Sequence, residues 1–103
     1  MTTWFITRHP GALEWAETQG LPIDRHCSHL TDANLTEDIK AGDTIIGSLP
    51  VHLAAIINQR GAAYYNLSLD LPAHLRGKEL SAEELTACNA RLEAYYVTRK
   101  TSQ

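Results

Sequence analysis

The chain has 103 residues, with 12 acidic and 9 basic side chains and a formal net charge of −3. This length leaves room for one compact domain over residues 1–103, in which 98–103 form a polar tail. Hydrophobic residues make up 44% and charged residues 20%, a balance that excludes a disordered or fibrous protein. Without a membrane-length apolar run, a secretory signal or a cationic face, the chain is expected to be cytoplasmic and to bind neither membranes nor duplex nucleic acid.

Strand-like and helix-like segments alternate along the chain. Short apolar, β-favouring runs predict strands at residues 4–7, 43–47 and 62–71, with a weaker candidate at 21–27. Apolar residues at helical spacing predict helices at residues 10–19 and 51–60, a helical turn at 36–40, and a helix that begins at a capping box of Ser81 and Glu84 and continues to Tyr96.

This alternation predicts an α/β domain of Rossmann-like type, with a mainly parallel sheet of about four strands flanked by helices. Right-handed crossovers favour the strand order 2-1-3-4. In that order the chain reverses direction between the first and third strands, and open α/β sheets bind ligands beyond the strand carboxyl ends at such a point. The candidate site therefore lies where residues 7–11 face residues 47–50.

Both segments of the candidate site open a helix, where free backbone N–H groups favour a phosphate. Arg8 adds forked donors for phosphate oxygens, and His9 can transfer a proton or donate a hydrogen bond. Ser48 is interpreted either as a helix cap or as a ligand contact. The predicted ligand-binding residues of these two segments are Thr7, Pro10, Gly11, Gly47, Ser48 and Leu49.

A third segment, the loop after the last of these strands, carries Arg76 and Lys78 around a glycine. These two cations could close over the same phosphate. By contrast, His26, Cys27 and His29 lack the complete ligand set of a zinc site, so we predict neither a metal nor a cofactor. The cysteines, Cys27 and Cys88, are too few for a disulfide framework.

The segment from Trp4 to Ala12, the Gly47–Pro50 segment, and Asp70–Pro72 followed by residues 76–80 together resemble a known family. This family is the sixteenth of the Csx series of small CRISPR-associated accessory proteins, found with type III CRISPR systems. The resemblance extends over nearly the whole chain, and its first motif is the most specific part.

The resemblance implies a ring nuclease, an enzyme that opens the cyclic oligoadenylate second messenger, chiefly cyclic tetra-adenylate. It also implies a small domain related to the CRISPR-associated sensor (CARF) domains, acting as a homodimer. In such an enzyme a ribose 2′-hydroxyl attacks the adjacent phosphorus without a metal. Arg8 and Lys78, or Arg76, would stabilise charge, and His9 would transfer or orient a proton.

Two other interpretations remain open at this stage. The chain could bind the cyclic nucleotide without cleaving it, because the same donors would suffice. Alternatively, Arg8 and His9 at the end of a first strand are similar to the Arg-His-Gly of histidine phosphatases, although here Pro10 intervenes before Gly11. Turnover separates a nuclease from a protein that only binds the ring, and release of phosphate from small monoesters would identify a phosphatase.

Overall fold

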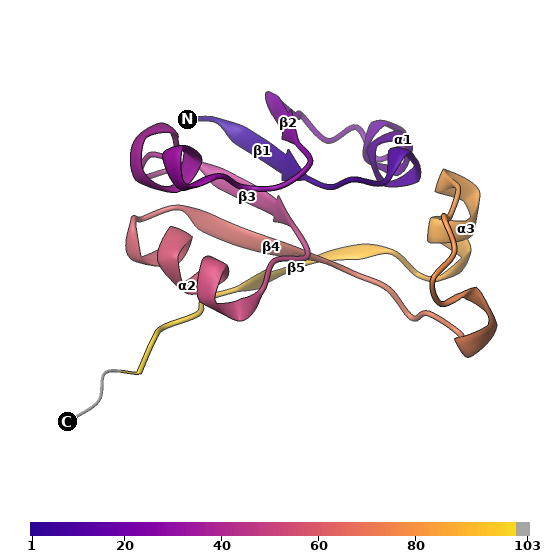
Figure 1. Cartoon of the computed structure of the whole chain (residues 1–103). Coiled ribbons are helices and arrows are strands. Elements are labelled where there is room, and N and C mark those ends of the chain that lie inside the picture. Colours follow the sequence, from indigo (N-terminus) through magenta and orange to yellow (C-terminus); the bar gives the residue numbers. More distant parts are fainter. Residues whose placement is uncertain (101–103) are drawn as a thin grey trace.

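The computed structural model describes residues 1–100 and contains one five-stranded sheet in the order β2-β1-β3-β4-β5 (Figure 1). The first four strands are parallel, which confirms the predicted order 2-1-3-4, and β5 pairs antiparallel with β4. The strand bounds are Thr3–Ile6 for β1, Arg25–Cys27 for β2, Thr44–Gly47 for β3, Ala63–Ser68 for β4 and Arg91–Tyr95 for β5.

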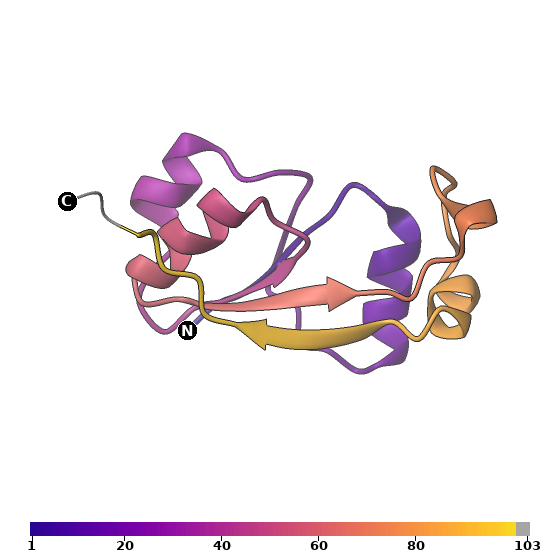
Figure 2. The same ribbon diagram turned by 90° about the horizontal axis from the view of Figure 1, so that it is seen from below.

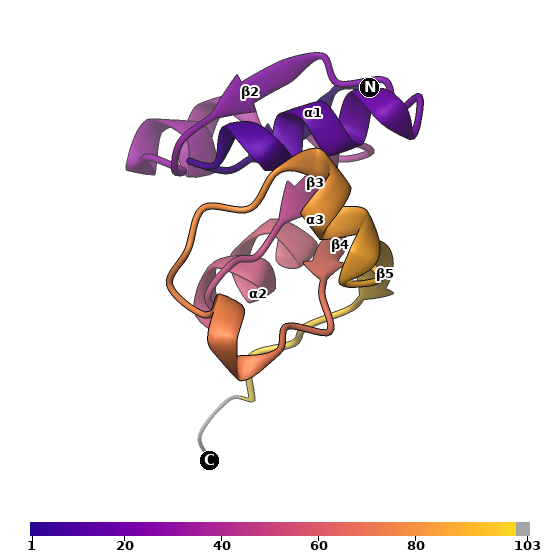
Figure 3. The same ribbon diagram turned by 90° about the vertical axis from the view of Figure 1, so that its right-hand side faces the viewer.

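Helices pack against both faces of this sheet and form two apolar clusters with it. In Figure 2, α2 lies on one side of β4 and β5, and α1 and α3 lie near one end of these strands. On one side, a π-helical turn η1 and helix α2 pack over Trp4, Ile45 and Tyr64. On the other side, α1 and α3 pack over Phe5 and Ile46, and these two helices lie next to each other (Figure 3). The helical bounds are Pro10–Thr18 for α1, Asn34–Asp38 for η1, Val51–Gln59 for α2, Ala73–Leu75 for the 3₁₀ turn η2 and Ala82–Ala87 for α3.

The predicted helix from Ser81 to Tyr96 is wrong in its second half. The capping box of Ser81 and Glu84 is present, but α3 ends at Ala87, and Asn89 has a φ of +58°. Asparagine tolerates this left-handed conformation, which cannot continue a right-handed helix. The chain then turns back as β5, an edge strand whose backbone groups pair with β4. The fold therefore has one strand more than predicted.

A buried carboxylate fixes the amino end of the sheet. Asp43, 3% exposed, accepts hydrogen bonds from the backbone N–H of Thr2 at 2.9 Å and of Lys40 at 3.0 Å, and from the Trp4 indole at 3.3 Å. Burial alone would raise the pKa of Asp43, but these donors outweigh burial and lower that pKa below its ordinary value. The Asp43 carboxylate thus joins the chain before β1 to the turn before β3.

No helix within residues 1–100 combines the length and the apolar character that crossing a bilayer requires.

Candidate functional site

An open cavity of about 730 Å³ lies at the carboxyl ends of the parallel strands, where the sequence places the site. Its volume is within the range of roughly 300–1,000 Å³ that is usual for ligand sites. Its apolar floor comes from β1, β4, α2, α3 and the segments that follow β2, β3 and β4. The apolar side chains that line the cavity are Phe5, Ile6, Leu30, Leu49, Leu53, Leu67, Leu69, Leu71, Leu80 and Leu85.

The segment after β1 is held by three hydrogen bonds that meet at Thr7. The Thr7 backbone N–H donates to Cys27 O at 2.9 Å, and the Thr7 hydroxyl accepts from the His9 backbone N–H at 3.1 Å. His26 Nε2 donates to Thr7 O at 2.9 Å. These contacts fix the turn that presents Arg8 and His9, both exposed, at the cavity wall.

His9 has a defined side-chain partner. Its Nδ1 lies 2.6 Å from Glu79 Oε1, although 70 residues separate the two positions in the chain. His9 is also the N-cap of α1 by position, but its side chain makes no capping hydrogen bond. The imidazole is therefore oriented by the distant loop that carries Glu79 and not by its own helix.

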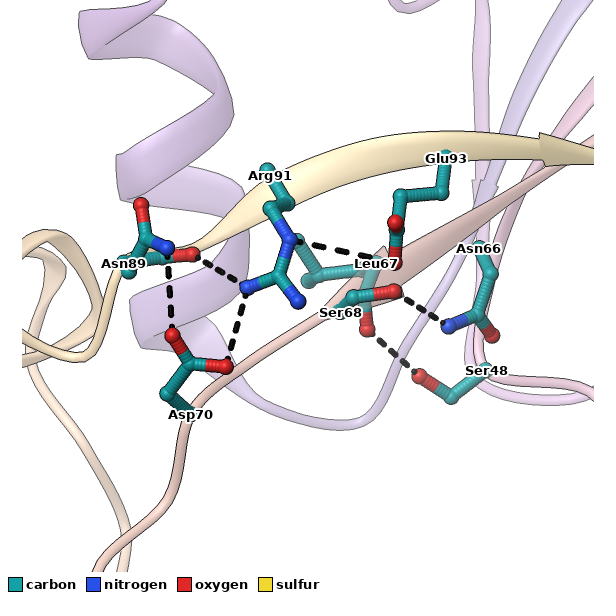
Figure 4. Close-up of polar contacts among 8 residues, drawn as sticks. All are labelled: Ser48, Asn66, Leu67, Ser68, Asp70, Asn89, Arg91 and Glu93. Atoms are coloured by element: carbon teal, nitrogen blue, oxygen red, sulfur yellow. Dashed lines mark hydrogen bonds and ion pairs between the residues drawn. The ribbon is translucent and has the colours of Figure 1, made fainter.

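The segment after β3 depends on a close approach between strands. A Cβ on Gly47 would lie 2.7 Å from Ile6 O, so the glycine permits the adjacent strand β1 to pack there. Ser48 is not the cap of α2, because Pro50 holds that position. Instead, the Ser48 hydroxyl donates to Leu67 O at 3.2 Å, which ties the segment to β4 (Figure 4).

Tyr64 supports the same segment from below. Its hydroxyl accepts a hydrogen bond from the Leu49 backbone N–H at 3.0 Å, and it lies 2.7 Å from Asn66 Oδ1 and 3.2 Å from Gly47 O. Burial raises the pKa of Tyr64 above its ordinary value, so this hydroxyl keeps its proton at neutral pH. Sequence reasoning did not identify Tyr64 as part of the site, because its role depends on the pairing of β3 with β4.

The loop from η2 to α3 is fixed where it crosses α1. A Cβ on Gly11 would lie 1.8 Å from Leu80 O, which shows how closely this loop packs on the first turn of α1. The glycine therefore accommodates the loop backbone, whereas we expected it to accommodate a phosphate. Immediately before Leu80, the loop presents Glu79 to His9 and Lys78 to the cavity.

The segment between β4 and η2 is held by a polar cluster at the end of β4 (Figure 4). The Asp70 carboxylate accepts hydrogen bonds from Asn89 Nδ2 at 3.1 Å and from Arg91 at 3.2 Å. The pKa of Asp70 is held below its ordinary value, mainly by the hydrogen bond from Asn89 and next by Arg91. Arg91 also lies 3.8 Å from Glu93. The exit of β4 is thus tied to the turn between α3 and β5.

Two cations line the cavity without acidic partners. Within residues 1–100, no carboxylate lies at ion-pair distance from Arg8 or Lys78. Unpaired cations beside an apolar lining are suited to an anion that carries an apolar group.

The structure brings most of the predicted site residues to one cavity and leaves three of them outside its lining. Pro10, Gly11 and Arg76 do not line the cavity. Ser28 and His29, which follow β2, line it without having been predicted as ligand-binding residues; they lie in the stretch of sequence with the weakest pattern. The predicted residues that do line it are Thr7, Arg8, His9, Gly47, Ser48, Leu49 and Lys78.

Among residues 1–100 there is no group of three or more His, Cys, Asp or Glu side chains arranged to hold a metal ion. His26 and His29 have separate environments, since His26 bonds to the backbone of Thr7 and His29 lines the cavity. Cys27 and Cys88 are both free thiols.

Residues 4–98 match the model of a protein family described as "Putative CRISPR-associated protein (Cas_VVA1548)". The chain belongs to this family. The match extends from β1 to the residue that follows Val97, so it includes every segment that lines the cavity. Neither the curated proteins nor the solved structures gave a match to the chain.

Proposed function

We propose that this CRISPR-associated protein is a ring nuclease that opens cyclic oligoadenylate, chiefly cyclic tetra-adenylate, and so ends type III CRISPR signalling in the cytoplasm. Membership of a CRISPR-associated family supports the biological setting. The resemblance to the Csx family of ring nucleases supplies the substrate class. The cavity supplies surfaces that suit the chemistry of that substrate.

The observation that carries the proposal is the pair of unpartnered cations, Arg8 and Lys78, over an apolar floor. A phosphodiester anion needs cationic or N–H donors, and an adenine needs an apolar surface on which to lie. Both requirements are met within one cavity. Arg8 is suited to two non-bridging oxygens of one phosphate because its donors form a planar fork.

The reaction follows from the chemistry of an RNA-type ring. The ribose 2′-hydroxyl attacks the adjacent phosphorus, the bond to the 5′-oxygen breaks, and a 2′,3′-cyclic phosphate and a 5′-hydroxyl remain. A metal is not required to generate the nucleophile, because the nucleophile belongs to the substrate and is already adjacent to phosphorus. In this proposal Arg8 and Lys78 stabilise the extra charge on phosphorus, and His9 transfers a proton.

A homodimer would complete the site. A cyclic tetra-adenylate has several equivalent phosphates, and two copies of this small cavity about a two-fold axis could contact opposite sides of the ring. Val51, which follows the cavity-lining Pro50 in the chain, is 70% exposed and offers apolar surface to a second protomer. Light scattering is expected to give a dimer with the ligand present, and a monomer under those conditions would contradict this part of the proposal.

The decisive experiment incubates the purified chain with cyclic tetra-adenylate in excess EDTA and separates the products by chromatography. The proposal predicts a linear oligoadenylate that ends in a 2′,3′-cyclic phosphate. Tight binding of the intact ring without any product would identify a protein that sequesters the messenger. Release of inorganic phosphate from a monoester, with the ring left intact, would identify the phosphatase alternative. Either result would refute the nuclease.

A further inference from the structure

The loop before α3 contacts the segment after β1 through the side chains of Glu79 and His9. The two side chains are 59% and 66% exposed, and the atoms Nδ1 and Oε1 are 2.6 Å apart. An ion pair this exposed contributes little to the stability of a fold, because water solvates both groups in the unfolded chain as well. The contact has a larger effect on the His9 imidazole, because a hydrogen bond at Nδ1 fixes the orientation of the imidazole and selects one of its two tautomers.

Glu79 reaches His9 because the backbone on both sides of it is constrained. On one side, Leu80 packs its carbonyl against Gly11, and Ser81 then begins α3 with a capping box. On the other side, the backbone N–H of Lys78 donates to Leu75 O at 3.3 Å, and Lys78 lines the cavity. The contact therefore joins the two segments that carry the candidate charge-stabilising groups.

We propose that Glu79 is a positioning residue for His9. The carboxylate accepts the Nδ1–H of the neutral imidazole, and Nε2 is left with a lone pair at the cavity wall. This inference rests on the proposed nuclease function and deepens it, because it gives His9 the role of general base and names the residue that sets this role. Carboxylate-bound histidines act in this way when a hydroxyl must lose its proton.

The proton transfers balance as follows. Nε2 accepts the proton of the ribose 2′-hydroxyl while the 2′-oxygen forms its bond to phosphorus. The bond from phosphorus to the 5′-oxygen breaks, that oxygen keeps the electron pair of the broken bond, and it accepts a proton from water. The imidazolium that forms is stabilised by Glu79 through Nδ1–H, and it later returns its proton to solvent. No oxidant or other co-reactant is consumed.

The test compares Glu79→Gln with a matched control, Glu83→Gln, in the full-length chain. Glu83 is an exposed glutamate on α3 that does not line the cavity. Two readouts are taken. The first is the tautomer of His9 from its ¹⁵N chemical shifts above the titration range. The second is kcat and KM for cyclic tetra-adenylate, with urea denaturation run on each variant to establish that folding is intact.

The inference predicts Nδ1–H as the main tautomer of His9 in the parent chain and in Glu83→Gln. It predicts a smaller share of this tautomer in Glu79→Gln, whose neutral amide can donate to Nδ1 as well as accept from it. It predicts that Glu79→Gln lowers kcat by roughly tenfold to a hundredfold with little change in KM or in urea stability. A parent chain with His9 mainly as Nε2–H would overturn the inference, as would a Glu79→Gln variant with parental kcat. A parent chain that cleaves nothing would instead refute the proposed function, and the role of Glu79 would fall with it.

Discussion

Replacing Gly11 by alanine tests how the candidate site is assembled. Gly11 is buried at the second position of α1, and an added Cβ would lie 1.8 Å from Leu80 O, 3.0 Å from Leu80 C and 3.3 Å from Ser81 C. All three of these atoms belong to backbone, so no side chain can rotate away. The loop between Lys78 and Ser81 must move outward, by about 1.6–2 Å if the oxygen is to reach ordinary van der Waals distance.

The free-energy balance has two opposing parts. Overpacking a close contact costs roughly 1–3 kcal/mol, and a clash with backbone belongs at the upper end of this range. Alanine in place of glycine inside a helix returns at most ~1 kcal/mol. We therefore expect Gly11→Ala to lower the free energy of unfolding by about 2 kcal/mol, and to weaken ligand binding because Lys78 and Glu79 move with the loop.

Urea denaturation measures the first effect, and titration with cyclic tetra-adenylate measures the second. Gly77→Ala is the matched control in the same loop. Its added Cβ meets nothing within 4 Å, so the variant loses only about 1 kcal/mol from its φ of +79°. A Gly11→Ala protein with parental stability and parental affinity would refute the packing of this loop against α1.

Three further predictions concern single side chains. Arg8→Ala should lower the single-turnover rate of cyclic tetra-adenylate cleavage by roughly a hundredfold with little loss of stability. The control Arg99→Ala, which removes the same charge elsewhere, should cleave at the parental rate. An Arg8→Ala variant that also cleaved at the parental rate would remove Arg8 from the site. Tyr64→Phe should cost about 1–2 kcal/mol in urea denaturation and speed hydrogen exchange of the Leu49 amide, whose acceptor it removes, and unchanged exchange would contradict this role. Asp43→Asn should cost roughly 2 kcal/mol at pH 7. Folding lowers the pKa of Asp43, so the stability that its carboxylate contributes is fully present above the unfolded pKa of ~3.9 and is lost as pH falls through the folded pKa. The free energy of unfolding should therefore change less with pH in acid for the variant than for the parent.

The segments with strong local patterns were predictable from the sequence. The apolar run that ends at Arg8 and the run that ends at Gly47 each precede a helix whose start is marked by proline, and both form parallel strands as expected. Since the carboxyl ends of parallel strands share one edge of the sheet, the position of the cavity followed from these local signals.

The end of the chain was mispredicted because two periodicities coincide there. Leu85, Cys88 and Leu92 fall at helical spacing, but Leu92 lies in β5, where it pairs with Leu67. Asn89 provided the local signal for a break, but the β-favouring residues Tyr96, Val97 and Thr98 lie beyond the end of β5 at Tyr95. Pairing with β4 decided the outcome, and such pairing is not visible in a local window.

The roles of the two glycines could not be predicted for a similar reason. Gly11 and Gly47 precede or open helices, as glycines at phosphate sites do, yet the atoms that occupy the space beside them belong to Leu80 and Ile6. Glu79 is a comparable case, because its partner His9 is 70 residues away. Contacts at such separations depend on the whole topology and leave no motif in the sequence.

The central claim is that a cyclic oligoadenylate binds in this cavity through Arg8 and Lys78. It is tested most directly by a crystal structure of the chain with cyclic tetra-2′-deoxyadenylate, which lacks the attacking hydroxyl and so stays intact. We expect a phosphate of the ring within hydrogen-bond distance of both side chains, with an adenine on the apolar floor. A ring bound elsewhere on the protein, with Arg8 and Lys78 in contact with solvent alone, would contradict the claim.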